Sequence, residues 1–113
     1  MFNFKIKWRV AYESKAILDE KLGLHSRFVE PSSFGEVLWV KDENGIHAFK
    51  NKCPHQNKPL NDCKIKNGHV VCPFHQYHFS IETGRGHGDS LYKFETKIEN
   101  GKVWLGKEVF SLF

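Results

Sequence analysis

The amino-acid sequence predicts a mainly β fold, a small antiparallel sandwich or barrel of short strands, from two observations. Apolar and polar side chains alternate along residues 4–10 and again along residues 92–98, which is the pattern of half-buried strands. The pair Asn-Gly occurs three times between predicted strands, at residues 44–45, 67–68 and 100–101, and it favours the positive backbone angles of two-residue hairpin turns. Because each hairpin pairs neighbouring strands, most of the strands are expected to be antiparallel.

The expected elements begin with the strand at residues 4–10, and a short helix follows at residues 14–22. Ser14 is a favourable N-cap residue for that helix, and Gly23 stands just past its end. The hairpins then pair residues 37–41 with 46–49, 63–66 with 69–71, and 91–98 with 102–105. Pro54 and Pro73 each follow a cysteine, and proline suits loops because it lacks a backbone N–H. We therefore expect the chemistry of this chain at two loop tips carried by hairpin ends.

The composition fits one globular domain over residues 1–113, because 40% of the residues are hydrophobic and 113 residues lie within the single-domain range. No apolar run approaches the roughly 20 residues that span a bilayer, and the first ten residues alternate charge and bulk instead of forming a signal peptide. We expect a monomer in the cytoplasm that does not bind a membrane.

The formal net charge is +4 and the pI is about 9.0. Such a charge favours binding to an acidic protein, a nucleic acid or a membrane surface. Lys and Arg are interspersed with acidic residues along the sequence, so we do not expect nucleic-acid binding. The chain has three cysteines, and an odd number without an export signal argues against a disulfide framework and favours metal ligation.

The strongest motif consists of two Cys/His pairs, Cys53-Pro-His55 and Cys72-Pro-Phe-His75, with the spacing C-x-H-x16-C-x2-H. Each pair offers one thiolate and one imidazole, which matches a binuclear cluster whose first iron takes both sulfurs and whose second takes both nitrogens. A structural zinc ion also accepts two Cys and two His. Zinc modules usually have two or more residues between paired ligands, whereas one residue separates Cys53 from His55.

The segments CPHQNKPL (53–60) and CPFHQYHF (72–79), followed by ETGR (82–85), resemble the two cluster loops of Rieske domains. The chain is similar to Rieske-type ferredoxins and to the electron-input domains of ring-hydroxylating oxygenases over roughly residues 4–106. The resemblance implies a Rieske-like sandwich or barrel whose cluster-binding subdomain is formed by two loops, at approximately residues 52–61 and 71–80. It also implies one [2Fe–2S] cluster, with Cys53 and Cys72 on one iron and His55 and His75 on the other.

The function implied by this resemblance is one-electron transfer from a flavin-dependent reductase to a terminal oxygenase or reductase. The chain would not be an enzyme by itself, because the sequence offers no second metal set, flavin or nicotinamide site, or activated nucleophile. One alternative is a small Rieske subunit of a multi-subunit reductase such as assimilatory nitrite reductase. Another is a structural metal-binding domain without redox activity.

Two departures from the high-potential members of the family concern the second loop and the loop clip. Those members have Ser and Tyr where this chain has Tyr77 and Phe79, so two hydroxyl donors to cluster sulfurs are missing and a low midpoint potential is expected. They also have an extra cysteine at each of the positions of Lys58 and Phe74, so a disulfide clip is absent. Leu60, Phe74, Tyr77 and Phe79 are candidates for a lid over the cluster.

The other conspicuous residues have plainer interpretations. Cys63 is expected to be a buried small hydrophobe. His25, His47 and His69 are predicted to be half-exposed sheet residues, and His78 and His87 lie nearer the site. The sequence Gly84-x-Gly86-x-Gly88 runs into a strand instead of opening a helix, so we interpret it as a loop passing close to the cluster and not as a nucleotide site.

Overall fold

The computed structural model describes residues 2–54 and 57–112, and it is mainly β, as predicted. The elements in chain order are β1 (Phe2–Tyr12), α1 (Lys15–Lys21), β2 (Ser26–Ser32), β3 (Gly35–Asp42), β4 (Gly45–Lys50), β5 (Lys64–Lys66), β6 (His69–Val71), β7 (His78–Ser80), β8 (Arg85–Gly86), β9 (Asp89–Ser90), β10 (Lys93–Glu99) and β11 (Lys102–Leu112). None of the described helices is long and apolar enough to cross a membrane.

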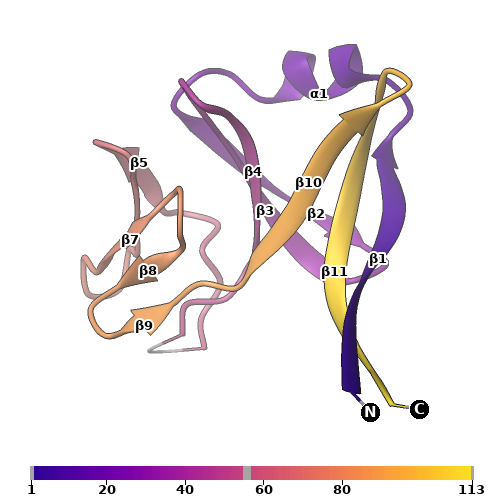
Figure 1. Cartoon of the computed structure of the whole chain (residues 1–113). Helices are drawn as coiled ribbons and strands as arrows, with labels where there is room; N and C mark the ends of the chain where they lie inside the picture. Colours follow the sequence, from indigo (N-terminus) through magenta and orange to yellow (C-terminus); the bar gives the residue numbers. More distant parts are fainter. Residues whose placement is uncertain (1, 55–56, 113) are drawn as a thin grey trace.

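The strands form three antiparallel sheets that divide the molecule into a large framework and a smaller subdomain. The large sheet has six strands in the order β1-β11-β10-β4-β3-β2. A three-stranded sheet, β5-β6-β7, and the short hairpin β8-β9 lie together to one side of it (Figure 1). The first and last strands pair with each other, so the two ends of the chain meet at the tip of the β1–β11 ribbon (Figure 1).

The three predicted hairpins are confirmed as β3/β4, β5/β6 and β10/β11. The predicted helix is confirmed as α1, where the Ser14 hydroxyl accepts a hydrogen bond from the Ala16 N–H at 3.2 Å. This bond satisfies one of the backbone donors that a helix leaves unpaired at its start.

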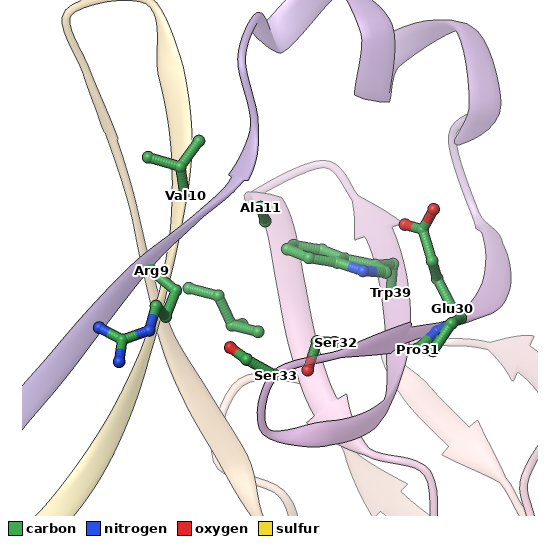
Figure 2. A pocket seen from close by; sticks show the side chains of 9 residues that line it. Arg9, Val10, Ala11, Glu30, Pro31, Ser32, Ser33 and Trp39 are labelled. Atoms are coloured by element: carbon green, nitrogen blue, oxygen red, sulfur yellow. The ribbon is translucent and has the colours of Figure 1, made fainter.

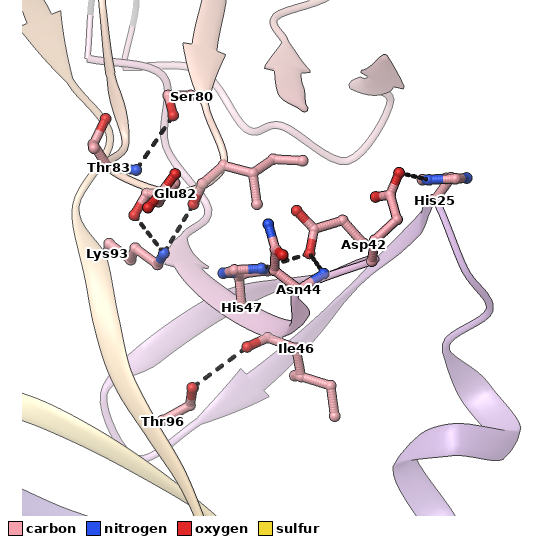
Figure 3. A network of polar contacts seen from close by, with 12 residues as sticks. His25, Asp42, Asn44, Ile46, His47, Ser80, Glu82, Thr83, Lys93 and Thr96 are labelled. Carbon is pink, nitrogen blue, oxygen red and sulfur yellow. Dashed lines mark hydrogen bonds and ion pairs between the residues drawn. The ribbon is translucent and has the colours of Figure 1, made fainter. Parts of the chain in front are cut away.

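The turns of these hairpins match the Asn-Gly prediction at two of the three sites. Asn67-Gly68 and Asn100-Gly101 take the expected positive φ angles, between 50° and 75°. The third pair is offset, because the turn residues are Glu43 and Asn44, and Gly45 already begins β4 with φ 122°. The cause is the Asp42 carboxylate, which accepts the Asn44 N–H at 2.9 Å and so closes the turn one residue earlier (Figure 3).

Several elements lie outside the sequence prediction. Strand β2 has no alternation to reveal it, because its side chains are mostly half-buried. The glycine-rich stretch folds into the β8–β9 hairpin, whose turn is His87-Gly88 with φ angles of 54° and 75°. The prediction that His25 is a sheet residue is wrong, since it occupies an exposed turn with φ 58° just before β2.

The core lies on both faces of strand β3, which explains its unbroken apolar run. Leu38 and Val40 belong to the apolar cluster shared with the small subdomain, whereas Val37 and Trp39 belong to the cluster on the other face of the sheet. On that second face the sheet curls until its edge strands approach each other. The hydroxyl of Tyr12 on β1 donates a hydrogen bond to the carboxylate of Glu30 on β2.

Candidate metal centre

The two Cys-Pro loops adopt the same type of backbone turn, although their sequences differ after the proline. The N–H of Cys53 donates to the carbonyl of Lys58, five residues later, and the N–H of Cys72 donates to the carbonyl of Tyr77, also five residues later; both distances are 2.8 Å. Each cysteine carbonyl also accepts an N–H from the fourth residue after it, at 2.7 Å from Asn57 and at 3.0 Å from Gln76.

In each loop, the residue at which the backbone reverses direction has a φ angle in the left-handed region. Asn57 has φ 55° and Gln76 has φ 56°, a conformation that Asn tolerates well and that Gln adopts less readily. Pro54 and Pro73 occupy equivalent positions at the start of each turn, where their missing N–H leaves no donor unsatisfied. The two loops therefore hold their cysteines in equivalent backbone settings.

These matched turns place two thiols side by side in the interior. The side chains of Cys53 and Cys72 are fully buried, and their Sγ atoms lie 3.4 Å apart. A disulfide needs about 2.05 Å, whereas two thiolates at about 2.3 Å from one tetrahedral metal stand about 3.8 Å apart. The separation is therefore too long for a disulfide and is close to the spacing of two thiolates on one metal atom.

Of the two predicted histidines, the structure describes one. The ring of His75 is exposed and lies 5.8 Å from the ring of Tyr77, while His55 lies outside the described residues. Among the residues that are described, no three metal-binding side chains gather at one point.

The four lid candidates divide into two groups. Leu60 and Phe79 are fully buried in the same apolar cluster as the two cysteines, and Tyr77 packs against that cluster while half-buried. Phe74, in contrast, is 43% exposed. Leu60, Tyr77 and Phe79 thus surround the thiols with apolar atoms, and Phe74 lies on the outer surface of the second loop.

The first loop is organised by Asn51, which sequence reasoning missed. This buried side chain accepts the N–H of Leu60 at 2.7 Å and donates to the Asn61 side chain at 2.8 Å. Asn51 therefore ties the start of the first loop to its end. Its position two residues before Cys53 is the only local signal, and no sequence rule assigns a role to it.

The second loop is supported by the β8–β9 hairpin. The Nε2 atom of His87 accepts the backbone N–H of His78 at 3.0 Å, and the His87 ring lies 4.8 Å from the ring of Tyr77. A side chain on Gly86 would collide with the carbonyl oxygen of His78, because a Cβ there would lie 2.0 Å from it. Gly86 thus permits the close approach that brings His87 onto the second loop.

Lys93 fastens the end of this subdomain to the large sheet. Its ammonium group donates to the carbonyls of Ile81 and Glu82, at 2.9 and 2.7 Å, just after β7 (Figure 3). Partial burial lowers the pKa of Lys93, and the carboxylates of Asp42 and Glu82 counter that effect. Because Lys93 begins β10, these two bonds fix the subdomain against the strand that continues into the framework.

The third cysteine has no part in the thiol pair. Cys63 is buried in the same apolar cluster, as expected of a small hydrophobe, and burial raises the pKa of its thiol to about 11. Its carbonyl accepts a hydrogen bond from the Arg27 guanidinium at 2.9 Å. This contact joins the end of the first loop to strand β2.

Comparison with known proteins agrees with this geometry. A family model described as the Rieske [2Fe-2S] domain matches residues 8–91. Human apoptosis-inducing factor 3 is 43% identical over 76 residues, which cover 64% of this chain and 13% of that protein. The ferredoxin component of the alkene monooxygenase system of Xanthobacter autotrophicus is 38% identical over 77 residues, which cover 65% of this chain and 63% of that protein.

A solved structure shows the same fold at low identity. The ferredoxin of carbazole 1,9a-dioxygenase from Nocardioides aromaticivorans IC177 superposes with a TM-score of 0.67 at 18% identity, over 86% of this chain and 93% of that one. The sandwich with a two-loop subdomain is therefore common to both chains.

Proposed function

The chain belongs to the Rieske [2Fe-2S] domain family, and on this premise we propose that it is a one-electron carrier and not an enzyme by itself. Family membership implies one Rieske-type cluster. The observation that carries the proposal is the buried pair of Sγ atoms, 3.4 Å apart, at the equivalent positions of two matched loops. The cluster would be held by Cys53 and Cys72 through sulfur and by His55 and His75 through ring nitrogen.

The chemistry that such a cluster supplies when bound is the reversible uptake of one electron. The residues of this chain hold it, shield it and connect it to the surface. Leu60 and Phe79 keep water from the buried thiolates, and the two backbone turns fix the direction of the cysteines. His75 is exposed, so its ring would place one edge of the cluster at the surface, where a partner protein can approach.

The partners that we propose are a flavin-dependent reductase as electron donor and a terminal oxygenase or reductase as acceptor. This follows from the relative that is named a ferredoxin component of an alkene monooxygenase system. We propose further that residues 1–113 act as a single domain, as a monomer, in the cytoplasm.

The test of the cluster is the visible absorption spectrum together with electron paramagnetic resonance of the reduced protein and a count of iron. We expect two irons per chain and an average g value near 1.9, as the resemblance to Rieske proteins implies, with one electron taken up reversibly. Bound zinc without iron would instead show the structural alternative. An average g value of about 1.96, typical of four thiolates, would contradict the histidine ligands.

Single substitutions assign the ligands. Cys53→Ala and Cys72→Ala should each lose the iron, because one thiolate alone holds the inner iron weakly, whereas Cys63→Ala should keep it. His75→Ala with an unchanged spectrum and midpoint potential would show that His75 is not a ligand.

A carrier and an enzyme subunit differ in native purification, since a subunit remains with its larger partner and a carrier elutes alone.

A further inference from the structure

Five cationic side chains that are distant in the sequence gather on one face of the large sheet. They come from strands β1, β4 and β11 and together form what we call the basic face: Lys5, Lys7, Arg9, Lys50 and Lys107. The strand register explains why those of β1 share a side. Arg9 lies opposite Leu105, a core residue, and alternate residues of a strand point the same way. The basic face thus continues the core side of the sheet along the β1–β11 ribbon.

Two small cavities mark the border between the basic face and the core. One, of about 120 Å³, is lined by Lys50 and Lys107 together with Phe34, Tyr92 and Phe94. The other, of about 180 Å³, lies between β1 and β2 and is lined by Arg9, Ser32 and Ser33 among others, with the Arg9 guanidinium directed away from Trp39 (Figure 2). Lys50 and Lys107 thus border a cavity with aromatic walls, and Arg9 borders a second cavity.

Within the basic face two like charges oppose each other directly. Lys7 and Lys107 are paired in the register of β1 and β11, and like charges at such a position destabilise a strand pair. Neither they nor Lys50 form an ion pair with any described residue. The repulsion is therefore not relieved inside the described part of the chain, and an anionic group from outside would relieve it.

Among the residues that line the two cavities there is one carboxylate, that of Glu30, and it is hydrogen-bonded to Tyr12 and to Lys21. It is therefore already paired with a cation outside the basic face. The formal net charge of the whole chain is +4, which favours attraction to an acidic surface.

The backbone of Lys50 leads from the basic face into the first metal-binding loop, and the Lys50 side chain lies on the Val37 side of the sheet, away from the apolar cluster that contains the two cysteines. Lys50 ends β4, and Cys53 follows three residues later, so the two Cα atoms are at most about 11 Å apart. The N–H of Lys50 also donates to the carbonyl of Tyr92 at 2.9 Å, which fixes the cavity wall against the start of that loop.

We propose that the basic face is a docking surface for an acidic patch of the redox partner protein, separate from the exposed tip that carries His75. This rests on the proposed function, since it assigns the orientation of an electron-transfer partner. A protein partner fits better than a nucleic acid, because the cavity with aromatic walls can receive an apolar side chain flanked by carboxylates. Docking here holds the partner beside the loop that begins at Asn51.

The test uses Lys107→Glu, which replaces the opposed lysine pair by an attractive Glu–Lys pair and so should not weaken the fold. The double variant Lys7→Glu/Lys107→Glu reverses both charges of the opposed pair and leaves Lys5 and Arg9 in place. Lys66→Glu on β5 is the matched control for Lys107→Glu, and Lys64→Glu/Lys66→Glu is the matched control for the double variant, because each makes the same change of charge at exposed lysines. Poly-L-glutamate serves as the probe of an acidic protein surface, and duplex DNA of equal charge and anionic vesicles are the comparison probes.

We expect the full chain to bind poly-L-glutamate at low ionic strength, with affinity reduced about tenfold in Lys7→Glu/Lys107→Glu and less than about twofold in Lys64→Glu/Lys66→Glu. Equal losses in these two double variants, or tighter binding of DNA or vesicles than of poly-L-glutamate, would overturn the proposal. The absorption spectrum of the same samples reports the cluster independently. If the spectrum shows no cluster, the proposed function fails. The binding measurement then tests the docking surface separately.

Discussion

The ammonium nitrogen of Lys58 lies 4.6 Å from the centre of the Phe74 ring, so a cation of the first metal-binding loop covers an aromatic ring of the second. These are the two positions at which high-potential Rieske proteins carry the cysteines of a loop clip. A cation–π contact at an exposed site contributes about 0.5–1 kcal/mol. The contact between Lys58 and Phe74 is therefore a weak non-covalent connection between the two loops, at the positions that a disulfide joins in the high-potential proteins.

Replacing Lys58 by Met keeps an unbranched side chain, one atom shorter, and removes its charge. We expect the cluster absorption to bleach about two- to fivefold faster in guanidinium, because the loops separate more readily. Lys58→Arg should retain the wild-type rate, since guanidinium also binds aromatic faces. Lys52→Met, at an exposed lysine just before Cys53, is the control. An identical rate in Lys58→Met and Lys52→Met would show that the contact has no effect.

His87 supports the second loop in two separable ways, through its ring and through its Nε2 acceptor. His87→Phe keeps a ring against Tyr77 and removes the acceptor of the His78 N–H. We expect hydrogen exchange of the peptide containing His78 to accelerate about two- to tenfold, as the loss of one hydrogen bond implies. His25→Phe, in an exposed turn, should leave that peptide unchanged. Unaltered exchange in His87→Phe, measured by mass spectrometry, would contradict the role of the acceptor.

Cys63 should make the stability of the protein depend on pH in the alkaline range. Burial raises the pKa of its thiol to about 11, whereas the unfolded chain releases that proton near pH 9. The stabilisation is therefore complete below pH 9 and is lost as pH rises to 11, by up to about 2–3 kcal/mol. Unfolding by denaturant should show this loss in the wild type and not in Cys63→Ala. Parallel curves for the two proteins would contradict the raised pKa.

The same burial predicts that the Cys63 thiol is unreactive in the folded protein. At pH 8 its thiol is protonated, and the thiolate is the reactive form. We expect iodoacetamide to modify Cys63 slowly in the native protein and rapidly after denaturation, as peptide mass spectrometry would show. Rapid native labelling would mean that the first loop opens.

The midpoint potential should lie near the low end of the Rieske range, at about −150 mV. Phe79 is fully buried in the apolar cluster that contains both site cysteines, and its ring offers no hydroxyl donor to their sulfurs. Phe79→Tyr should raise the potential by tens of millivolts if the new hydroxyl reaches a sulfur, because such bonds stabilise the more negative reduced state. Protein-film voltammetry gives the value. A wild-type potential above roughly +100 mV would overturn the argument.

Local signals in the sequence were sufficient for the hairpins, the helix and the two cysteine loops. Turn chemistry acts between neighbours, so Asn67-Gly68 and Asn100-Gly101 reveal their hairpins without knowledge of the rest of the chain. The two Cys-Pro pairs likewise predict the two candidate sulfur ligands, and the structure adds the distance between their Sγ atoms. Strand β2 and the β8–β9 hairpin have no such local signal, because their conformation depends on packing against β3 and β7.

The sequence by itself determined the candidate ligands, the loops that carry them and the antiparallel class of the fold. Only the tertiary structure decided which distant segments meet. The pairing of β1 with β11 turns lysines that look scattered in the sequence into the basic face, and the packing of the subdomain brings two sulfurs to 3.4 Å. The physical reason is that side-chain patterns encode local conformation, whereas contacts between distant strands depend on how the whole apolar surface is buried.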